Sequence, residues 1–330
     1  MFVPQVYSVA LAIMILSMIC WGSWANTQKA TGSWRFELFY WDYVWGILIF
    51  ALLIGVTAGR TDPASGDSFF HNLASADGAH LLFAFLGGIV FNIANILFVG
   101  AIAIAGMAVA FPVGVGLALV IGCVLNYLIT PKGNPLLLFG GVALVCVAIV
   151  LDALAYRRLS PDAKVTKKGL ILSLVSGFGM GLFYPFVAKG ISGENHLGPY
   201  TVAVVFAVGI LASNIPANIL VMRRPVLGPP VTFSDYFAGA GRLHLWGIIG
   251  GALWSVGTIS NFVASYAQMI GPATSYALGQ GATMVGAIWG VFVWKEFGGA
   301  SASTKRLLLL MFVFFIVGLA SVALAPVVRW

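Results

Sequence analysis

Ten apolar segments, each close to the length of a membrane-spanning helix, constrain the fold of this 330-residue chain more than any other feature. A helix needs about 20 apolar residues to cross a bilayer, and irregular backbone cannot cross it with its polar groups satisfied. The sequence therefore predicts an all-α polytopic membrane protein. The expected transmembrane helices cover residues 5–29, 38–59, 79–102, 106–129, 135–156, 168–190, 199–222, 243–269, 272–294 and 304–326.

The composition excludes an ordinary water-soluble domain. The chain is 60% hydrophobic and 8% charged, with a mean hydropathy of +1.00, whereas soluble domains carry roughly a quarter charged residues. The formal net charge of +7 does not indicate a nucleic-acid partner, because the cations occur in short clusters between apolar segments. The partner that this pattern indicates is the lipid bilayer.

An internal duplication is suggested by the two long polar connections, 60–78 and 223–241, which follow the second and the seventh expected helix. At an offset of 160 residues Lys29 aligns with Lys189, and at an offset of 163 Asn92 aligns with Ser255. We expect two five-helix repeats, residues 1–156 and 168–330, joined by a short cytoplasmic linker at 157–167. An odd number of helices makes such repeats inverted across the membrane, as in many secondary transporters.

Lysine and arginine in the loops predict the orientation of the chain. One set of alternate connections holds most of the cations, including the cluster Arg157, Arg158, Lys164, Lys167 and Lys168. The other set holds Arg60, Lys132, Lys189 and Arg329. Because cytoplasmic loops are enriched in lysine and arginine, we expect both termini outside the cytoplasm.

Motifs of soluble enzymes are missing from the sequence. There is no metalloprotease HExxH, no nucleophile elbow and no phosphate-binding loop. The four histidines, His71, His80, His196 and His244, fall in loops or at helix ends without ligand spacing, and the three cysteines sit singly in apolar runs. We therefore expect no enzymatic activity, no cofactor and no metal.

Asp42 is the carboxylate that stands out, since it lies about one turn into the second expected helix among aromatic residues. Polar groups at membrane depth are costly and commonly functional. A carboxyl group in a medium of low dielectric constant favours its protonated form, which suits a proton-coupling site. The alternative is an interfacial aspartate in an aromatic belt, paired with Lys29, Arg35 or water.

Asp152 precedes Arg157 and Arg158 by little more than a turn. We expect a local ion pair at this helix end, and the alternative is a proton relay.

A set of amides, hydroxyls and indoles inside the spans predicts a substrate site between the two halves. Asn92 and Asn95 lie one turn apart, and the offset of 163 aligns them with Ser255 and Thr258. The alternative for this paired polar face is hydrogen bonding between helices. The other expected substrate contacts are amides close to the helix ends and aromatic rings that could stack on a planar solute: Asn26, Gln28, Gln280, Trp21, Trp24 and Trp254.

Three stretches, CWGSWANTQK, FELFYWDY and AFPVGVGLALVIGCVLNYL, resemble bacterial members of the drug/metabolite transporter superfamily. The resemblance is closest to the ureide permeases and to the sugar-transporting rhamnose and glucose/ribose porters, and it covers nearly the whole chain. Ureide permeases carry an Asp-Tyr pair that Asp42 and Tyr43 match. The resemblance implies proton-coupled import of a small polar nutrient across a bacterial inner membrane.

The chain departs from the plant ureide permeases in its linker, which is short and lacks their nucleotide-binding-like motif. Nucleobases, nucleosides and sugars therefore stay open beside ureides. The function expected from the sequence is secondary active transport by alternating access, with the solute and a proton as partners. The alternatives are an exporter of amphipathic drugs or metabolites and a membrane receptor that binds without transport.

Overall fold

The computed structural model describes residues 1–60, 68–159, 166–267 and 269–328. In this part of the chain ten helical spans are long and apolar enough to cross a membrane, which confirms the all-α prediction. The spans are Tyr7–Ala30 (α1, Tyr7–Ser23, and α2, Ala25–Ala30), Phe36–Thr57 (α3), Gly78–Ala105 (α5), Phe111–Ile129 (η1, Phe111–Val115, and α7, Gly116–Ile129), Pro135–Leu159 (α8), Lys167–Gly190 (α9), Pro199–Arg223 (α10), Gly241–Tyr266 (α12), Pro272–Val293 (α13, Pro272–Gly279; α14, Ala282–Ile288; η2, Trp289–Val293) and Ala302–Leu324 (α15).

The first span is divided into α1 and α2 at Trp24, and two further spans depart from a regular helix. A four-residue helix, Met107–Ala110 (α6), and the π-helical η1 open the fourth span, where Pro112 cannot donate a backbone hydrogen bond. The ninth span is interrupted between α13 and α14 at Gln280 and Gly281, and it ends in the π-helical η2. Each long polar connection also carries a short helix, Phe69–Ser75 (α4) and Phe233–Phe237 (α11).

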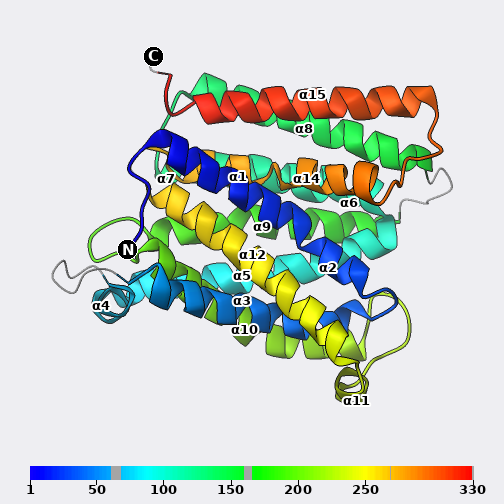
Figure 1. The fold of residues 1–330 in the computed structure, drawn as a ribbon, viewed down its shortest axis with the longest axis horizontal. Helices are drawn as coiled ribbons and strands as arrows, with labels where there is room; N and C mark the ends of the chain where they lie inside the picture. The colour runs from blue at the N-terminus through cyan, green and yellow to red at the C-terminus, as the bar shows by residue number, and fades with distance from the viewer. Residues whose placement is uncertain (61–67, 160–165, 268, 329–330) are drawn as a thin grey trace.

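The N-terminus and the end of α15 lie on one side of the molecule, and α2 and α11 lie on the opposite side (Figure 1). We name the second side the α11 face. The sequence places this face in the cytoplasm, which stays a prediction. Part of the expected linker 157–167, together with Lys164 and Arg329, lies outside the described residues.

Contacts between helices follow a pattern that is preserved when the two predicted halves are exchanged. The α3–α12 contact has its counterpart in α10–α5, and the α5–α9 contact has its counterpart in α12–α1. The α8–α15 and α3–α10 contacts join equivalent helices of the two halves. The inverted repeat remains a prediction that this pattern supports.

Glycines bring α3 and α12 into backbone contact. A Cβ atom at Gly251 would lie 2.0 Å from the carbonyl oxygen of Tyr43, and one at Gly46 would lie 2.4 Å from that of Ile248. The same device joins α5 to α10, since a Cβ atom at Gly88 would lie 2.0 Å from a carbonyl oxygen of α10. Close backbone approach through small residues is typical of membrane helix pairs. It places the polar side chains of α3 beside those of α12.

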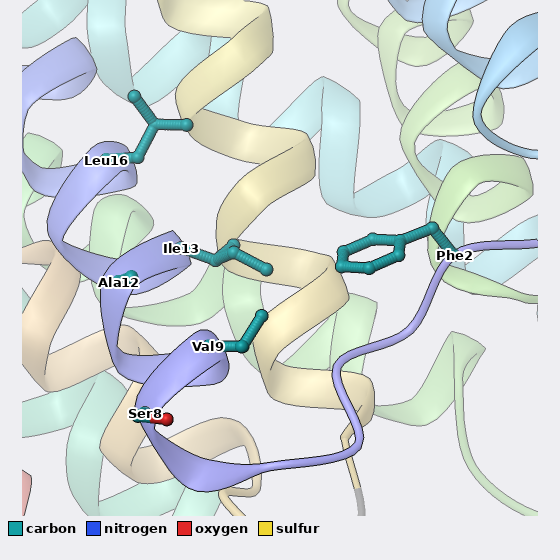
Figure 2. Close-up of a pocket in the computed structure, with 6 residues that line it drawn as sticks. All are labelled: Phe2, Ser8, Val9, Ala12, Ile13 and Leu16. Carbon is teal, nitrogen blue, oxygen red and sulfur yellow. The ribbon is translucent and has the colours of Figure 1, made fainter.

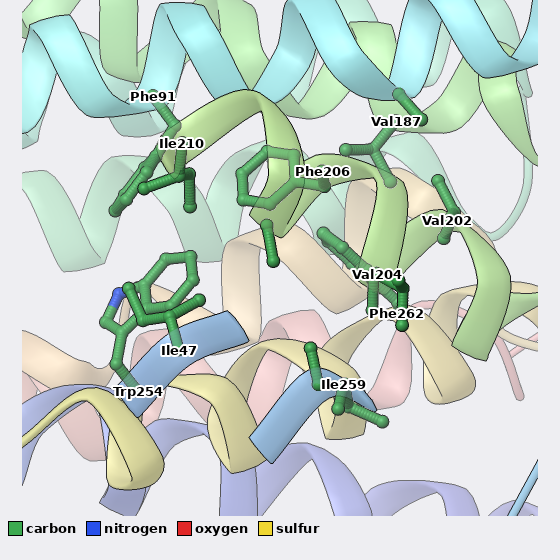
Figure 3. Packing of buried hydrophobic residues seen from close by; sticks show 14 of the residues in the cluster. Ile47, Phe91, Val187, Val202, Val204, Phe206, Ile210, Trp254, Ile259 and Phe262 are labelled. Atoms are coloured by element: carbon green, nitrogen blue, oxygen red, sulfur yellow. The ribbon is translucent and has the colours of Figure 1, made fainter. Parts of the chain in front are cut away.

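A cluster of buried aromatic and aliphatic side chains fills the centre of the α3, α5, α10 and α12 group (Figure 3). Phe206 contacts Phe91, Trp254 and Phe262 with ring centroids 5.7 to 6.1 Å apart. Large apolar side chains elsewhere point outward, including Leu128 and Leu136, which are more than two-thirds exposed. Such an apolar exterior suits the hydrocarbon core of a bilayer.

Candidate functional site

Asp42 lies between α3, α11 and α12, where three elements meet near the α11 face. Its Oδ1 accepts a hydrogen bond from the hydroxyl of Tyr236 at 2.6 Å, and its Oδ2 lies 2.9 Å from Nδ1 of His244. A Cβ atom at Gly247 would lie 2.4 Å from that of Asp42, so α12 approaches the carboxylate closely. We name Asp42, Tyr236 and His244 the carboxylate cluster.

The short helix α11 is held over the carboxylate cluster by its own capping. Thr232 and Asp235 form a capping box, in which the carboxylate accepts hydrogen bonds from the Thr232 N–H and hydroxyl. These hydrogen bonds lower the pKa of Asp235 below its ordinary value. Burial, followed by the hydrogen bond and charge of Asp42, raises the pKa of Tyr236 above its ordinary value. The Tyr236 phenol therefore remains a donor at neutral pH.

Neither of the cations expected beside Asp42 contacts it. Lys29 pairs with Glu296 at 2.6 Å, and Arg35 pairs with Glu37 at 2.7 Å and donates to backbone carbonyls of the α10–α11 connection. The alternative of an Asp42 pair with Lys29 or Arg35 is therefore wrong. The reason is geometric, because Tyr236 of α11 and His244 of α12 already contact the two oxygens of Asp42.

Asn92 and Asn95 share a face of α5, as predicted, and both are bound by one tyrosine of α3. The Tyr40 hydroxyl donates to Asn92 Oδ1 at 2.9 Å and accepts from Asn95 Nδ2 at 3.0 Å. Asn92 Nδ2 in turn donates to Ser213 on α10. We name these four residues the amide cluster. Since they are buried and bonded to one another, they join helices in this conformation.

Thr258 and Trp254 lie with Trp21 at the contact of α12 with α1. The Trp21 indole N–H donates to Thr258 Oγ1 at 3.0 Å, and the two indole rings stack with centroids 6.2 Å apart. The Trp21 ring occupies a slot between Gly257 and Gly279, where a Cβ atom would lie 2.7 and 2.6 Å from it. Ser255 is buried on the same helix. No hydrogen bond between described residues joins Ser255 or Thr258 to the amide cluster, and Phe91 of α5 packs against Trp254 of α12.

The remaining predicted contacts lie around α2 and the break in the ninth span. Asn26 accepts a hydrogen bond from the indole of Trp294 at 2.6 Å, and Trp24 packs on Tyr43 with centroids 4.7 Å apart. The side chains of Gln28 and Gln280 are half-buried and bond to no other described residue. Gln280 follows Gly279, which adjoins Trp21. These two amides are available to a solute.

Two hollows of about 410 and 470 Å³ open on outward faces of the helices. The first is apolar and lies beside α1, lined by Phe2, Ser8, Val9, Ala12, Ile13 and Leu16 (Figure 2). The second lies between α5 and α10 and reaches Ser213 of the amide cluster. None of the predicted solute contacts lines either hollow.

Several residues of these clusters were not predicted from the sequence. Tyr40 and Tyr236 resemble aromatic belt residues, and His244 belongs to no motif. A further buried group joins Tyr184, Asn261 and Ser275, with the Tyr184 hydroxyl donating to Asn261 Oδ1 at 2.5 Å. In this part of α3, Asp42 was recognisable from the sequence as a carboxylate among aromatic residues and as a member of the Asp-Tyr pair.

The ureide permease family model matches residues 39–170 and 163–325, so it covers both predicted halves and its two segments meet at the linker. Ureide permease 1 of Arabidopsis thaliana is 24% identical over 376 residues, spanning 94% of this chain and 95% of that protein. Probable ureide permease A3 of Vigna unguiculata is 22% identical over 332 residues, spanning 78% and 88%. A protein crystal structure superposes with a TM-score of 0.65 at 13% identity, over 95% of this chain and 96% of the other, and shares the fold. The chain belongs to the ureide permease family.

Proposed function

We propose that the protein imports a ureide-type solute by proton-coupled secondary active transport. Family membership across both halves is the observation that carries the proposal, and it favours a transporter over an enzyme, an amphipathic-drug exporter or a receptor. The relatives named above are called ureide permeases or probable ureide permeases. They are plant proteins, so the bacterial inner membrane and the external termini stay predictions.

The proposed solute site lies where α1, α12 and the interrupted ninth span meet. Gln280 supplies both a donor and an acceptor there, and the stacked Trp21 and Trp254 offer flat surfaces. A ureide carries N–H donors and carbonyl acceptors on a planar group, which a side-chain amide can bind in two directions. Asn26 and Gln28 on α2 would contact the solute from the α11 face. Ureides are favoured over sugars by this planar match and by the family.

Asn92, Asn95, Ser255 and Thr258 have a different place in the proposal. Hydrogen bonds of Asn92 and Asn95 hold α5 to α3, and that of Thr258 holds α12 to α1. Ser255 is buried on α12. Alternating access requires such contacts to exchange as the two halves rock against each other. We infer that these side chains bind the solute after that exchange, when Tyr40 releases Asn92 and Asn95 and Trp21 releases Thr258.

Asp42 is the proposed proton-coupling group. As a carboxylate it accepts from both Tyr236 and His244, which ties α11 and α12 to α3. A proton on Asp42 removes its negative charge and makes one of its oxygens a donor, which weakens the hydrogen bonds that it accepts from Tyr236 and His244. We infer that α11 then detaches from α3. This movement would open a path from the α11 face to the solute site.

Uptake of a radiolabelled ureide such as allantoin into proteoliposomes tests the proposal. An inward proton gradient should drive accumulation by the wild-type protein, and Asp42→Asn should keep solute exchange while losing accumulation. Asp77→Asn, which alters an exposed aspartate before α5, is the matched control. Binding without flux would indicate a receptor, and equal accumulation by Asp42→Asn would remove Asp42 as the coupling group.

A further inference from the structure

Glu296 lies in the connection that follows η2, and each of its two carboxylate oxygens has a partner. Oε1 pairs with Lys29 of α2 at 2.6 Å, and Oε2 accepts from the Tyr156 hydroxyl of α8 at 2.8 Å. Lys29 also lies 4.3 Å from the centre of the Trp294 ring. One ammonium and one phenol therefore satisfy this carboxylate.

The backbone around Glu296 is built to turn its side chain inward. Lys295 has a φ of 53°, a left-handed conformation that costs energy in any residue other than glycine. The Glu296 N–H then donates to the carbonyl of Gly290 at 3.0 Å. A Cβ atom at Gly290 would lie 2.7 Å from the Tyr156 hydroxyl and 2.8 Å from Glu296 Oε2. Gly290 therefore leaves the space that the Tyr156 hydroxyl and the Glu296 carboxylate occupy. Backbone strain such as that at Lys295 is commonly found at functional sites.

Asp152 lies one turn before Tyr156 on the same helix, α8, so the two side chains share a face. It is 5% exposed, and its Oδ1 has no hydrogen-bond partner among the described residues. None of the three ion pairs between described residues includes it. The local pair expected with Arg157 or Arg158 does not form, since both arginines are exposed and Arg158 donates to Ser303.

Among the residues that the structure describes, no cation pairs with Asp152. Asp152 interacts electrostatically with Glu296 and Tyr156. In the described part of the chain, four other helical elements pack on α8. The titratable residues of α15 are Lys305 and Arg306, and both are exposed. Those of α7 are Cys123 and Tyr127, and α6 and η1 carry none. Lys29 forms its ion pair with Glu296 and not with Asp152.

A buried carboxylate with an unpartnered oxygen, beside a second carboxylate, cannot stay ionised at low cost. We infer that Asp152 and Glu296 form a carboxyl pair that binds one proton, a site separate from the carboxylate cluster. In this conformation the proton resides on Asp152, and Glu296 is the carboxylate that Lys29 and Tyr156 satisfy. The charges of the site then cancel, with one negative and one positive group.

Binding of a second proton would have a mechanical consequence. Protonated Glu296 has no charge to hold Lys29, so α2 would lose its anchor to the connection after η2. Asn26 and Gln28 are carried on α2, and the role of this release in transport rests on the proposed function.

Infrared spectroscopy of the purified protein at neutral pH, in a detergent without ester groups, tests the site directly. The wild-type spectrum should contain the carbonyl stretch of a protonated carboxylic acid, and Asp152→Asn should lose that band. Asp77→Asn should retain it. Persistence of the full band in Asp152→Asn, or its absence from the wild type, would overturn the inference.

A second variant guards against a folding defect. Glu296→Gln keeps the hydrogen bond to Tyr156 but removes the negative charge, so Asp152 can ionise against Lys29, and the band should shrink. An unchanged band in a variant that melts like the wild type would also contradict the pair. These outcomes do not depend on uptake, so a failure of the transport assay leaves them standing.

Discussion

Asp42 and His244 are 202 positions apart in the sequence, and their side chains meet at 2.9 Å. The contact joins the second turn of α3 to the first turn of α12, and Tyr236 completes it from α11. The proposed coupling group is therefore also the point at which the second long polar connection is fastened to the membrane-spanning helices. In the proposed function, proton binding to Asp42 would therefore be linked to movement of that connection.

Replacing His244 by alanine should destabilise the protein. The substitution leaves the buried Asp42 carboxylate with Tyr236 as its remaining donor, and a hydrogen bond to a charged group contributes about 2 kcal/mol. Chemical denaturation in detergent should show a loss of that size. His71→Ala is the matched control, because His71 is exposed and its ring bonds to no described residue. Equal stability of the two variants would contradict the contact.

The capping box of α11 should open at acid pH. The folded pKa of Asp235 lies below its unfolded value, so the stability that it contributes is present above pH about 4 and is lost as pH falls further. Hydrogen exchange of residues 232–238, corrected for the intrinsic rate, should accelerate below that pH. Asp235→Asn should abolish this pH dependence, and its survival in the variant would assign the opening to another group.

Tyr40 and Tyr43 provide a matched pair of hydroxyl deletions on α3. Tyr40→Phe leaves Asn92 without its donor and Asn95 without its acceptor, and each buried unsatisfied group costs about 1–3 kcal/mol. The Tyr43 hydroxyl is buried and has no partner in the described part of the chain. We expect a lower melting temperature for Tyr40→Phe and little change for Tyr43→Phe. The reverse order would show that the amide cluster does not hold α5 to α3.

The number and limits of the spans could be predicted because bilayer thickness acts on each segment separately. The breaks at Gln280 and the short helices α4 and α11 were missed, since they depend on local backbone and packing rather than on hydropathy. Asn92 and Asn95 were recognisable as a polar face from their spacing alone. Their partner Tyr40 was not, because an aromatic residue near a helix end suits the membrane interface equally well.

The error at Asp152 has a clear physical cause. Sequence proximity to Arg157 and Arg158 suggested a local ion pair, but a helix turns the arginines toward solvent while Asp152 faces the connection after η2. Long-range pairs such as Asp42 with His244 leave no local trace either. Charged residues in membrane helices take their partners from the packing of the bundle, which one sequence does not contain.

Gly251→Ala should disrupt the α3–α12 contact on which the carboxylate cluster depends. The added Cβ atom would lie 2.0 Å from the Tyr43 carbonyl oxygen and 2.7 Å from the Ile47 nitrogen, both backbone atoms that cannot rotate away. Overpacking of this kind costs about 1–3 kcal/mol or more. Gly140→Ala on α8 is the control, because no atom lies within 4 Å of its added Cβ, and alanine in a helix is favoured over glycine by about 0.5–1 kcal/mol. Thermal unfolding should therefore shift down for Gly251→Ala and slightly up for Gly140→Ala. A Gly251→Ala protein that melts like the wild type would mean that α3 and α12 do not pack backbone to backbone.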